Sequence, residues 1–195
     1  LYWPSLTGQK ILLPLDILAR PGFYLPRESA QNIRVQNPIL SDMILQMEPF
    51  RRFAASEVRA GRLPLWDPYD YCGAPFLANN QSAVFSPYRV LDYCFPSPRI
   101  LAWTQLAQAL VAGIGAYLFF RRALRVHVLP ALIGGWCYPL TGALVFWTGY
   151  TIGAVITFTP WIFLFVDRAI RGPFRAGMIG LALATAAAMV AGHSA

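Results

Sequence analysis

The chain has 195 residues, of which 56% are hydrophobic and 13% are charged, with a net charge of +7 and a mean hydropathy of +0.46. Soluble domains carry about 25% charged residues, so this composition excludes an ordinary water-soluble domain. The basic excess lies in two short loops between apolar runs and forms no stripe or motif, which excludes a nucleic-acid-binding protein. The sequence therefore predicts an all-α membrane protein.

The charges divide the chain into two parts. Residues 1–100 hold ten Lys/Arg and eight Asp/Glu, whereas residues 101–195 hold six Arg and one acid, Asp167. The first part can face water, and the second is typical of a segment that faces lipid. We therefore expect an extracytoplasmic loop segment of short helices and coil over 1–100 and a transmembrane bundle over 101–195.

The first part contains one clear helical signal. Ser41 can cap a helix that begins at Asp42. Pro49 is expected to kink or restart that helix, because proline lacks a backbone donor. A second helical piece over 50–60 is predicted to end at Gly61, since glycine is favoured just after a helix.

Residues 1–38 and 63–98 are predicted to be mainly loop, the first with short helices. The second range is punctuated by six prolines and carries aromatic side chains that argue against disorder.

The cysteines show no metal-ligand spacing, and Cys137 lies in an apolar run. A Cys72–Cys94 disulfide is permitted in an extracytoplasmic segment, but two unpaired buried thiols are the favoured interpretation.

Four apolar runs in the second part are long enough for membrane-spanning helices, which need about 20 residues to cross a hydrocarbon core of ~30 Å. The predicted spans cover residues 101–120, 128–146, 152–169 and 176–193. The last is rich in alanine and glycine, which let helices pack closely in a membrane bundle. The runs show no charge at mid-membrane, and we expect no broken helix among them.

The connections between the spans set the predicted orientation. The arginines between the first and second spans and between the third and fourth are Arg121, Arg122, Arg125, Arg168, Arg171 and Arg175. By the positive-inside rule both loops are cytoplasmic, so residues 1–100, the uncharged link 147–151 and the end at His193 share the outer face. The aromatic residues predicted to lie near span ends are Trp103, Trp147, Tyr150 and Trp161.

Two groups of polar residues in the first part are candidates for a site. Asp42 and Gln46 are spaced i, i+4 on one helix face, where a carboxylate and an amide can bind a sugar hydroxyl or a metal ion. The alternative, favoured by spacing alone, is an acid stabilised by the helix dipole. Glu48, Arg51 and Arg52 can place an acid and two cations at one mouth, and the alternative is a solvated charge cluster.

Residues 66–69, 73–76 and 79–82 combine aromatic rings, amides and a carboxylate. Carbohydrate sites use these groups, because rings stack on sugar faces and amides bind hydroxyls in directed pairs. The alternative is a rigid, proline-rich loop on the membrane surface, and composition does not separate the two. His193 is a functional candidate as an ionisable residue near a span, or it merely marks the end of that span.

A joined pattern of short motifs runs from residue 37 to residue 87. It consists of Asn37-Pro38, Ser41-Asp42-x-x-x-Gln46-x-x-Pro49, Gly61-Arg62-Leu63-Pro64-Leu65-Trp66-Asp67-Pro68-Tyr69 and Gly73-x-Pro75-Phe76-x-Ala78-Asn79-x-Gln81-Ser82-x-x-Phe85-x-Pro87. The pattern resembles the outer loop of the YfhO-like family of bacterial membrane proteins. Leu140-Thr141-Gly142, Trp161 and Gly192-His193 also fit, but the family often has Pro-Gln after Gly-His, where this chain has Ser194-Ala195.

The YfhO-like family resembles the GT-C glycosyltransferases, which take a sugar from a polyprenyl-phosphate carrier on the outer face of the membrane. The resemblance implies a GT-C-like helical bundle, of which this chain is an N-terminal fragment. It also makes Asp42 the counterpart of the acid in the first outer loop that is central in that class. Both ends of the sequence look cut, so we expect an upstream span and further spans downstream.

The sequence therefore predicts a multi-pass glycosyltransferase of the bacterial inner membrane. It would transfer a sugar from a polyprenyl-phosphate-linked donor to an envelope polymer or lipid, in contact with membrane lipid and without nucleic acid. Asp42 is the predicted base, or it holds a metal that orients the acceptor; the need for a divalent metal ion stays open. The predicted substrate-binding residues are Gln46, Glu48, Arg51, Arg52, Trp66, Asp67, Gln81, Arg89 and His193.

The alternative is a non-enzymatic membrane protein, either a transporter or flippase of lipid-linked sugar or a structural component of the envelope. Broken helices or charges at mid-membrane would indicate a transporter. Asp42 and Trp66 lining one cavity would favour the enzyme, whereas an Asp42 in bulk water would favour the structural alternative.

Overall fold

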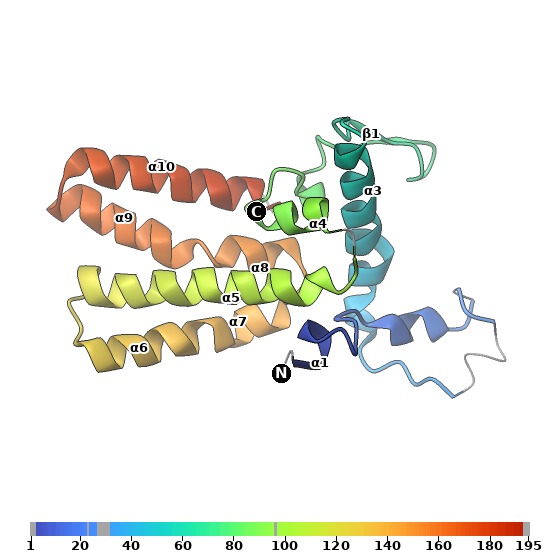
Figure 1. The fold of residues 1–195 in the computed structure, drawn as a ribbon, viewed down its shortest axis with the longest axis horizontal. Coiled ribbons are helices and arrows are strands. Elements are labelled where there is room, and N and C mark those ends of the chain that lie inside the picture. Colours follow the sequence, from blue (N-terminus) through green and yellow to red (C-terminus); the bar gives the residue numbers. More distant parts are fainter. Residues whose placement is uncertain (1–2, 23, 27–31, 96, 193–195) are drawn as a thin grey trace.

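The computed structural model describes residues 3–22, 24–26, 32–95 and 97–192. Within these residues four helical rods form a bundle, and the preceding segment gathers at one end of it (Figure 1). In chain order the rods are α5 (Ile100–Leu118) with the π turn η6 (Phe119–Ala123), α6 (Val128–Cys137) with η7 (Tyr138–Leu140) and α7 (Gly142–Phe146), α8 (Thr151–Ile156) with α9 (Thr159–Arg171), and α10 (Phe174–Val190).

The four rods of the described chain coincide with the four predicted spans to within a few residues. Three of them, Ile100–Ala123, Val128–Phe146 and Thr151–Arg171, are long and apolar enough to cross a membrane. Helix α10 is apolar but has only 17 residues, which corresponds to about 26 Å of helix rise and lies at the lower limit for a span. The chain is thus a mostly helical membrane protein.

Two of these rods are interrupted, so the prediction of unbroken helices is wrong. Pro139 lies in the break between α6 and α7, and Pro160 lies in the first turn of α9, just after the break that follows α8. Proline has no N–H for the carbonyl four residues earlier, which for Pro160 is the carbonyl of Ile156. The Tyr138 hydroxyl donates to that carbonyl at 3.1 Å. A side chain at the first break therefore supplies a hydrogen bond to the backbone carbonyl that is left without a partner at the second break. Buried backbone groups in a membrane need such partners, because no water is available there.

Close backbone contact joins α5 to α6. A Cβ on Gly113 would lie 2.9 Å from the Gly135 carbonyl oxygen, and a Cβ on Gly135 would lie 2.9 Å from the Gly113 carbonyl oxygen, so larger residues would force the helices apart. The placement of Trp161 near a span end is wrong. It lies at the middle of the third rod, where its indole N–H donates to the Val111 carbonyl of α5 at 2.9 Å.

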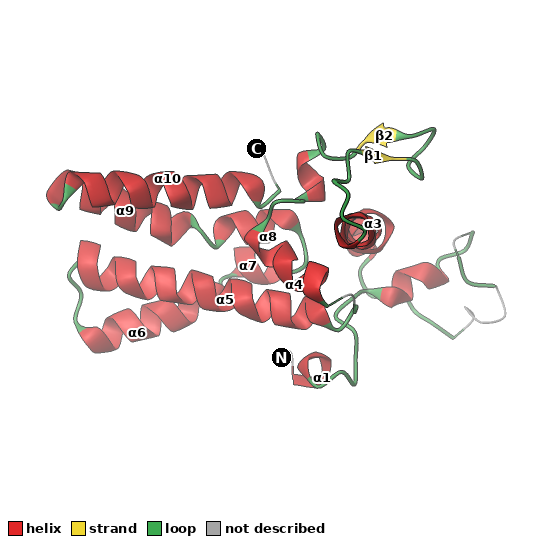
Figure 2. Cartoon of the chain, turned by 45° about the horizontal axis from the view of Figure 1, so that its top comes forward, coloured by secondary structure: helices red, strands yellow, loops and turns green. Residues whose placement is uncertain are grey.

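The segment before the bundle is a series of short elements joined by loop, as predicted. They are α1 (Trp3–Leu6), η1 (Leu15–Ala19), η2 (Pro38–Leu40), the π turn η3 (Met43–Met47), α3 (Glu48–Arg59), β1 (Trp66–Asp67), β2 (Ala74–Pro75), η4 (Asn80–Ser82), η5 (Pro87–Arg89) and α4 (Val90–Cys94). Strands β1 and β2 form an antiparallel hairpin in which Trp66 pairs with Pro75. Figure 2, which looks along α3, shows this helix lying across the end of the bundle with the hairpin beside it.

The long outer helix begins differently from the prediction. Ser41 is itself helical, with φ −55° and ψ −39°, so it cannot cap; Asn37 instead caps η2 by accepting from the Ile39 N–H at 3.1 Å. The chain then passes through the π turn η3 before Pro49. This wider turn lets the helix continue into α3, because a π register does not require the i−4 hydrogen bond that proline lacks. Helix α3 ends as predicted, before Gly61 at φ +72°.

Aromatic packing holds the loop over 63–98 against α3. Phe76 is 2% exposed, and its ring lies edge-on to the rings of Phe50 and Phe53, with centroids 5.3 and 4.9 Å apart. Burying a phenylalanine side chain contributes roughly 1.5–3 kcal/mol. Among the aromatic residues of this proline-rich loop, Phe76 and Tyr88 are therefore buried, whereas Trp66, Tyr69, Tyr71 and Phe85 are exposed.

The two ends of the bundle differ. The outer segment, the link 147–151 and Gly192 meet at one end, which we call the loop end. The Tyr150 hydroxyl lies 3.4 Å from the Ile39 carbonyl oxygen, and a Cβ on Gly192 would lie 3.0 Å from the carbonyl oxygen of Asn80. The loops that carry the arginines lie at the opposite, arginine end (Figure 1). The membrane face that each end occupies stays a prediction from the positive-inside rule.

The cysteines are Cys72, Cys94 and Cys137, and all are unpaired and exposed. The interpretation of Cys72 and Cys94 as buried thiols is therefore wrong. Cys72 lies in the turn between β1 and β2, and Cys94 lies at the last position of α4, where the loop leaves the packed core. Any labelling experiment needs a variant in which the three are replaced by serine.

In that background we expect Ala60→Cys to be labelled by a membrane-impermeant thiol reagent in intact cells and Leu124→Cys to be labelled only after permeabilisation. The reason is the excess of arginine at the arginine end. Ala60 and Leu124 are both exposed, Leu124 by 54%, whereas the adjacent Ala123 is 6% exposed and would not react on either side. Labelling of Leu124→Cys but not of Ala60→Cys in intact cells would reverse the orientation.

Candidate functional site

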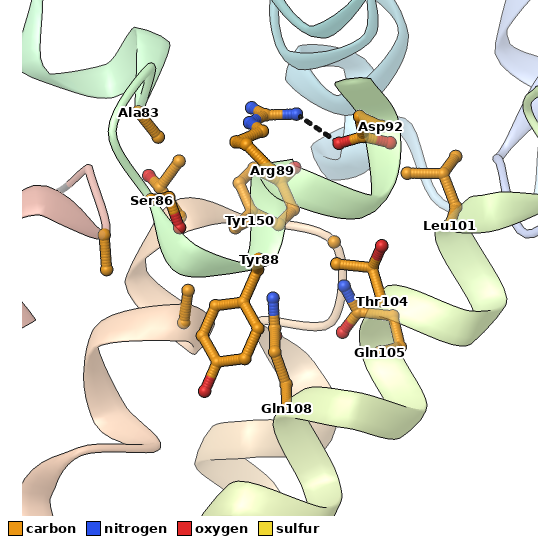
Figure 3. Close-up of a pocket in the computed structure, with 14 residues that line it drawn as sticks. Ala83, Ser86, Tyr88, Arg89, Asp92, Leu101, Thr104, Gln105, Gln108 and Tyr150 are labelled. Atoms are coloured by element: carbon orange, nitrogen blue, oxygen red, sulfur yellow. Dashed lines mark hydrogen bonds and ion pairs between the residues drawn. The ribbon is translucent and has the colours of Figure 1, made fainter. Parts of the chain in front are cut away.

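A small polar cavity lies where the outer segment meets the loop end of the bundle (Figure 3). We call it the Arg89 cavity. Its volume is about 40 Å³, which is room for about three water-sized groups. The polar side chains that line it are Ser86, Tyr88, Arg89, Asp92, Thr104, Gln105, Gln108 and Tyr150, together with Thr151.

Helix α5 contributes a polar stripe to this cavity. Thr104, Gln105 and Gln108 are buried within an otherwise apolar helix, and their spacing places them along one side of it. The Thr104 hydroxyl is buried and has no hydrogen-bond partner in the described part of the chain. Buried polar atoms are nearly always satisfied, so this hydroxyl marks a place where water or a ligand group is expected to bind.

Tyr88 ties η5 to the interrupted third rod. Its hydroxyl lies 2.6 Å from Oγ1 of Thr157, and the Thr157 hydroxyl itself donates to the Ala154 carbonyl at 2.6 Å. Tyr88 is therefore the donor in the first of these bonds. Burial raises the pKa of Tyr88 to about 12, and the hydrogen bond with Thr157 opposes only part of that rise. The phenol stays neutral at physiological pH and acts as a structural link.

A buried charge network lies beside the cavity, and we call it the Arg51 network. Asp92 is 1% exposed and accepts from Arg51 Nη1 at 2.7 Å. Arg51 also donates to both carboxylate oxygens of Glu48, at 2.7 and 2.9 Å. The mostly exposed Arg52 adds a bond to Glu48 at 2.6 Å. The interpretation of residues 48–52 as a solvated cluster is therefore wrong for Glu48 and Arg51, because both side chains are buried and Arg51 pairs with the buried Asp92.

The electrostatics of this network favour its ionised form. Burial by itself raises the pKa of Glu48, but hydrogen bonds and charges from Arg51 and Arg52 outweigh burial and hold that pKa below its usual range. Burial likewise lowers the pKa of Arg51, but its bonds to Glu48 and Asp92 more than offset this effect. Each of the three nitrogens of the Arg51 guanidinium thus donates to one of its two carboxylate partners.

Arg89 is the least compensated cation of the network. Its side chain is 13% exposed, and its polar partner among the described residues is Asp92, whose Oδ2 lies 3.4 Å from Arg89 Nη1. Burial lowers the pKa of Arg89, and the attraction of Asp92 opposes this only in part. The guanidinium borders the cavity (Figure 3), so its remaining N–H groups are available to an anion.

Gln46 and Gln81, both predicted site residues, come together. Gln46 Nε2 donates to Gln81 Oε1 at 3.0 Å, across 35 residues of sequence. The side chain of Asn79 accepts from the Gln81 N–H at 3.1 Å and so holds η4 in place. The amide pair joins the outer loop to the helix that carries Asp42, and each amide keeps further donor and acceptor capacity.

Asp42 is exposed and makes no hydrogen bond or ion pair with the other residues that the structure describes. Burial raises the pKa of Tyr150, and the Asp42 carboxylate adds to that rise. Because Tyr150 lines the Arg89 cavity, Asp42 lies near the cavity but outside it. An exposed Asp42 is the arrangement expected of the structural alternative.

Trp66 and Asp67 lie apart from Asp42. Their hairpin packs on α3 through the rings of Phe53 and Tyr69, whose centroids are 6.2 Å apart. Asp42 lies 11 residues before Phe53 on the same helical stretch, which corresponds to a rise of roughly 16 Å along the helix axis. Trp66 is 55% exposed and does not line the Arg89 cavity. Asp67 is buried and accepts from the Tyr69 N–H at 2.9 Å, which holds the turn. The structure therefore does not bring these residues into one site with Asp42.

Asp92 and the polar residues of the stripe on α5 were not among the predicted site residues, although Gln105 and Gln108 are recognisable from the sequence as mild polar residues within a span. The spacing of Asp92 three residues after Arg89 was a readable signal for a helical ion pair. The stripe was also readable, as the polar residues that interrupt an apolar span. The contact between Arg51 and Asp92 joins positions 41 residues apart, and no local pattern indicates it. The predicted site residue His193 lies outside the described residues.

The metal-holding role predicted for Asp42 does not fit the residues that the structure describes. Among them no three His, Cys, Asp or Glu side chains lie together. Asp42 and Gln46 offer a single carboxylate and an amide that is already engaged with Gln81, whereas protein sites for hard divalent cations use several oxygen ligands.

The resemblance to the YfhO-like family rests on the motifs between residues 37 and 87. No protein-family model, curated protein or solved structure matches this chain.

Proposed function

We propose that this chain belongs to an integral membrane glycosyltransferase that moves a sugar from a polyprenyl-phosphate carrier to a cell-envelope acceptor. The observation that carries the proposal is Arg89, a partly buried and incompletely neutralised cation, 13% exposed, beside a polar cavity at the loop end of the bundle. Nucleotide sugars are cytoplasmic, so a transferase at the outer face needs a lipid-linked donor. The leaving group of that donor is a phosphate, whose charge a cation must stabilise.

Arg89 fits this role better than the other arginines of the network. The charge of Arg51 is offset by two carboxylates, those of Glu48 and Asp92, and Arg52 is 65% exposed, so solvent screens its charge. Arg89 combines burial with free N–H groups, and a guanidinium in a water-poor site binds phosphate oxygens strongly.

The size of the cavity sets the arrangement of the donor. A volume of about 40 Å³ admits phosphate oxygens but not a sugar ring. In this proposal the phosphate meets Arg89 and the Thr104 hydroxyl, and the sugar lies outside, on the side of Asp42 and Tyr150. On the other face of α5, Leu91, Phe95 and Trp103 line part of an apolar groove of about 450 Å³ that suits the isoprenoid chain.

Asp42 then serves as the general base. An acceptor hydroxyl is a weak nucleophile at neutral pH, and a carboxylate near it can accept its proton. The hydroxyl oxygen forms a bond to the anomeric carbon, the bond from that carbon to the phosphate oxygen breaks, and polyprenyl phosphate leaves with the electron pair. The exposure of Asp42 leaves it free to meet an acceptor polymer or lipid.

We expect Arg89→Gln to lower kcat/KM for a radiolabelled polyprenyl-phosphate sugar by roughly ten- to hundredfold in the reconstituted full-length protein. A hydrogen bond to a charged group is worth roughly 1.5–3 kcal/mol. The variant should stay folded, because Arg51 keeps its 2.7 Å bond to Asp92. Arg62→Gln is the matched control, since it removes the same charge from an exposed pair with Glu57. Equal activity of the two variants would contradict the role of Arg89.

A flippase or carrier of lipid-linked sugar is the second candidate. The breaks at Tyr138–Leu140 and after Ile156 favour it, because transporters build their sites from interrupted helices. The same proteoliposomes separate the two functions. Movement of intact donor between leaflets, without transfer to added envelope acceptor, would support the carrier, whereas release of polyprenyl phosphate together with labelled acceptor would support the enzyme.

A further inference from the structure

A second charged cavity lies at the arginine end of the bundle, opposite the Arg89 cavity. It has a volume of about 220 Å³ and lies where η6 and the loop after it face the last turns of α9 and the turn into α10. Ala123 and Leu164 form its buried apolar floor. The charged side chains that line it are Arg122, Arg125, Asp167, Arg168 and Arg171.

The charges around this cavity do not balance. Its one lining carboxylate, Asp167, pairs with Arg171 at 3.2 Å. The side chains of Arg122, Arg125 and Arg168 have no hydrogen bond or ion pair with any residue that the structure describes. Four cations and one carboxylate leave three positive charges around a single hollow.

The positive-inside rule accounts for the presence of arginines in these loops, but not for the fact that arginines from two loops line the same cavity. Arg175 has the same charge and lies in the same turn region, yet it does not line the cavity. The loop that carries Arg125 turns through a left-handed conformation at that residue, with φ +56°. Few non-glycine residues adopt this conformation. Two separate loops thus direct their guanidinium groups toward one place.

We propose that this cavity binds a phosphate-ester anion, with the headgroup of an anionic phospholipid as its occupant. Guanidinium forks match the geometry of phosphate oxygens. The cavity lies at the ends of the membrane helices, and basic pockets between spans in such positions bind anionic lipids. This site is independent of the proposed glycosyl transfer, because it lies at the other end of the bundle from Arg89 and Asp42.

The test uses the full-length protein in phosphatidylcholine nanodiscs or detergent, titrated with phosphatidylglycerol. Native mass spectrometry counts the retained lipid, and thermal unfolding reports its stabilising effect. We expect phosphatidylglycerol, but not added phosphatidylcholine, to be retained and to raise the melting temperature. The double variant Arg122→Gln with Arg168→Gln should weaken this binding by about tenfold or more, since each lost charged hydrogen bond is worth about a factor of ten.

Two further variants keep the result interpretable. Arg175→Gln removes a charge from the same end but not from the cavity, so it should retain phosphatidylglycerol as the wild type does. The double variant Arg122→Lys with Arg168→Lys keeps both positive charges but lacks the planar guanidinium groups, so it should bind phosphatidylglycerol with intermediate strength. It replaces the double glutamine variant in the test if that variant does not fold. Equal loss in Arg175→Gln, or full retention in both double variants, would overturn the site.

A parallel titration with glycerol 3-phosphate distinguishes the source of the anion. If it binds with the same dependence on Arg122 and Arg168, and phosphatidylglycerol shows no advantage, the assignment to a lipid is overturned in favour of a soluble phosphate ester. If only the lipid binds, the assignment stands. Glycosyl transfer is not measured in either arm, so failure of this inference is distinct from failure of the proposed function.

Discussion

Asp92→Asn is expected to destabilise the protein by about 3–5 kcal/mol, the usual cost of breaking a buried ion pair from one side. The Asp92 side chain is 2% exposed and faces the buried Arg51 and the partly buried Arg89: its oxygens lie 2.7 Å from Arg51 Nη1 and 3.4 Å from Arg89 Nη1. Asparagine keeps one acceptor for Arg51 but carries no charge, and its amide group would face Arg89. Arg89 would then be buried without a counterion.

The measurement is the midpoint of unfolding of the purified protein in mixed micelles, by added denaturing detergent or by heat. Glu57→Gln is the control, because Glu57 pairs with Arg62, which is 64% exposed, and surface pairs contribute little. The Glu57→Gln midpoint should stay close to that of the wild type. Similar midpoints for Asp92→Asn and Glu57→Gln would show that the Arg51 network does not stabilise the loop end.

Asp42→Asn is expected to lower the rate of glycosyl transfer by about 10²–10⁴-fold, which is the usual contribution of a general base. This result rests on the proposed function. Asp42 has no hydrogen bond or ion pair with the rest of the described chain and is exposed, so asparagine should leave the fold and the unfolding midpoint unchanged. It keeps the shape of the side chain but cannot accept the proton of an acceptor hydroxyl.

Asp67→Asn is the parallel control for the same assay. Asp67 is 6% exposed and its Oδ1 accepts from the Tyr69 N–H at 2.9 Å, a bond that the amide oxygen of asparagine can replace. Transfer by this variant should stay close to normal. Activity of Asp42→Asn with loss in Asp67→Asn would move the base to Asp67, and activity in both would count against an enzyme and in favour of the carrier.

Much of the bundle could be predicted from the sequence, because membrane insertion is decided by the local content of apolar side chains. The span predicted over 101–120 corresponds to Ile100–Ala123, and that over 128–146 corresponds to Val128–Phe146. The end of α3 before Gly61 was also predictable, since a left-handed residue after a helix strongly favours glycine.

The candidate site could be predicted only in part. Arg89 and Asp42 were identifiable as ionisable residues of a water-facing segment, but the distinction between Arg89 and the arginines Arg51 and Arg52 was not, because it depends on burial and on the partners of each side chain. Arg89 is partly buried because η5 and α4 lie between α3 and α5. Asp42 is exposed because it precedes the part of the helix that the loop covers. Trp66 does not line the cavity near Asp42, and no local pattern in the sequence indicates on which part of the helix the hairpin that carries Trp66 packs.

What the sequence by itself determined is the set of apolar helices, three of them long enough to span a membrane, and the division of charge between the two ends of the bundle. Both follow from local composition. What only the tertiary structure decided is the pairing of Arg51 with Asp92 across 41 residues, the cavity beside Arg89, and the breaks at Pro139 and Pro160. A proline shows where a backbone hydrogen bond is missing. Whether the helix breaks there depends on a partner elsewhere in the fold, such as the Tyr138 hydroxyl that binds the Ile156 carbonyl.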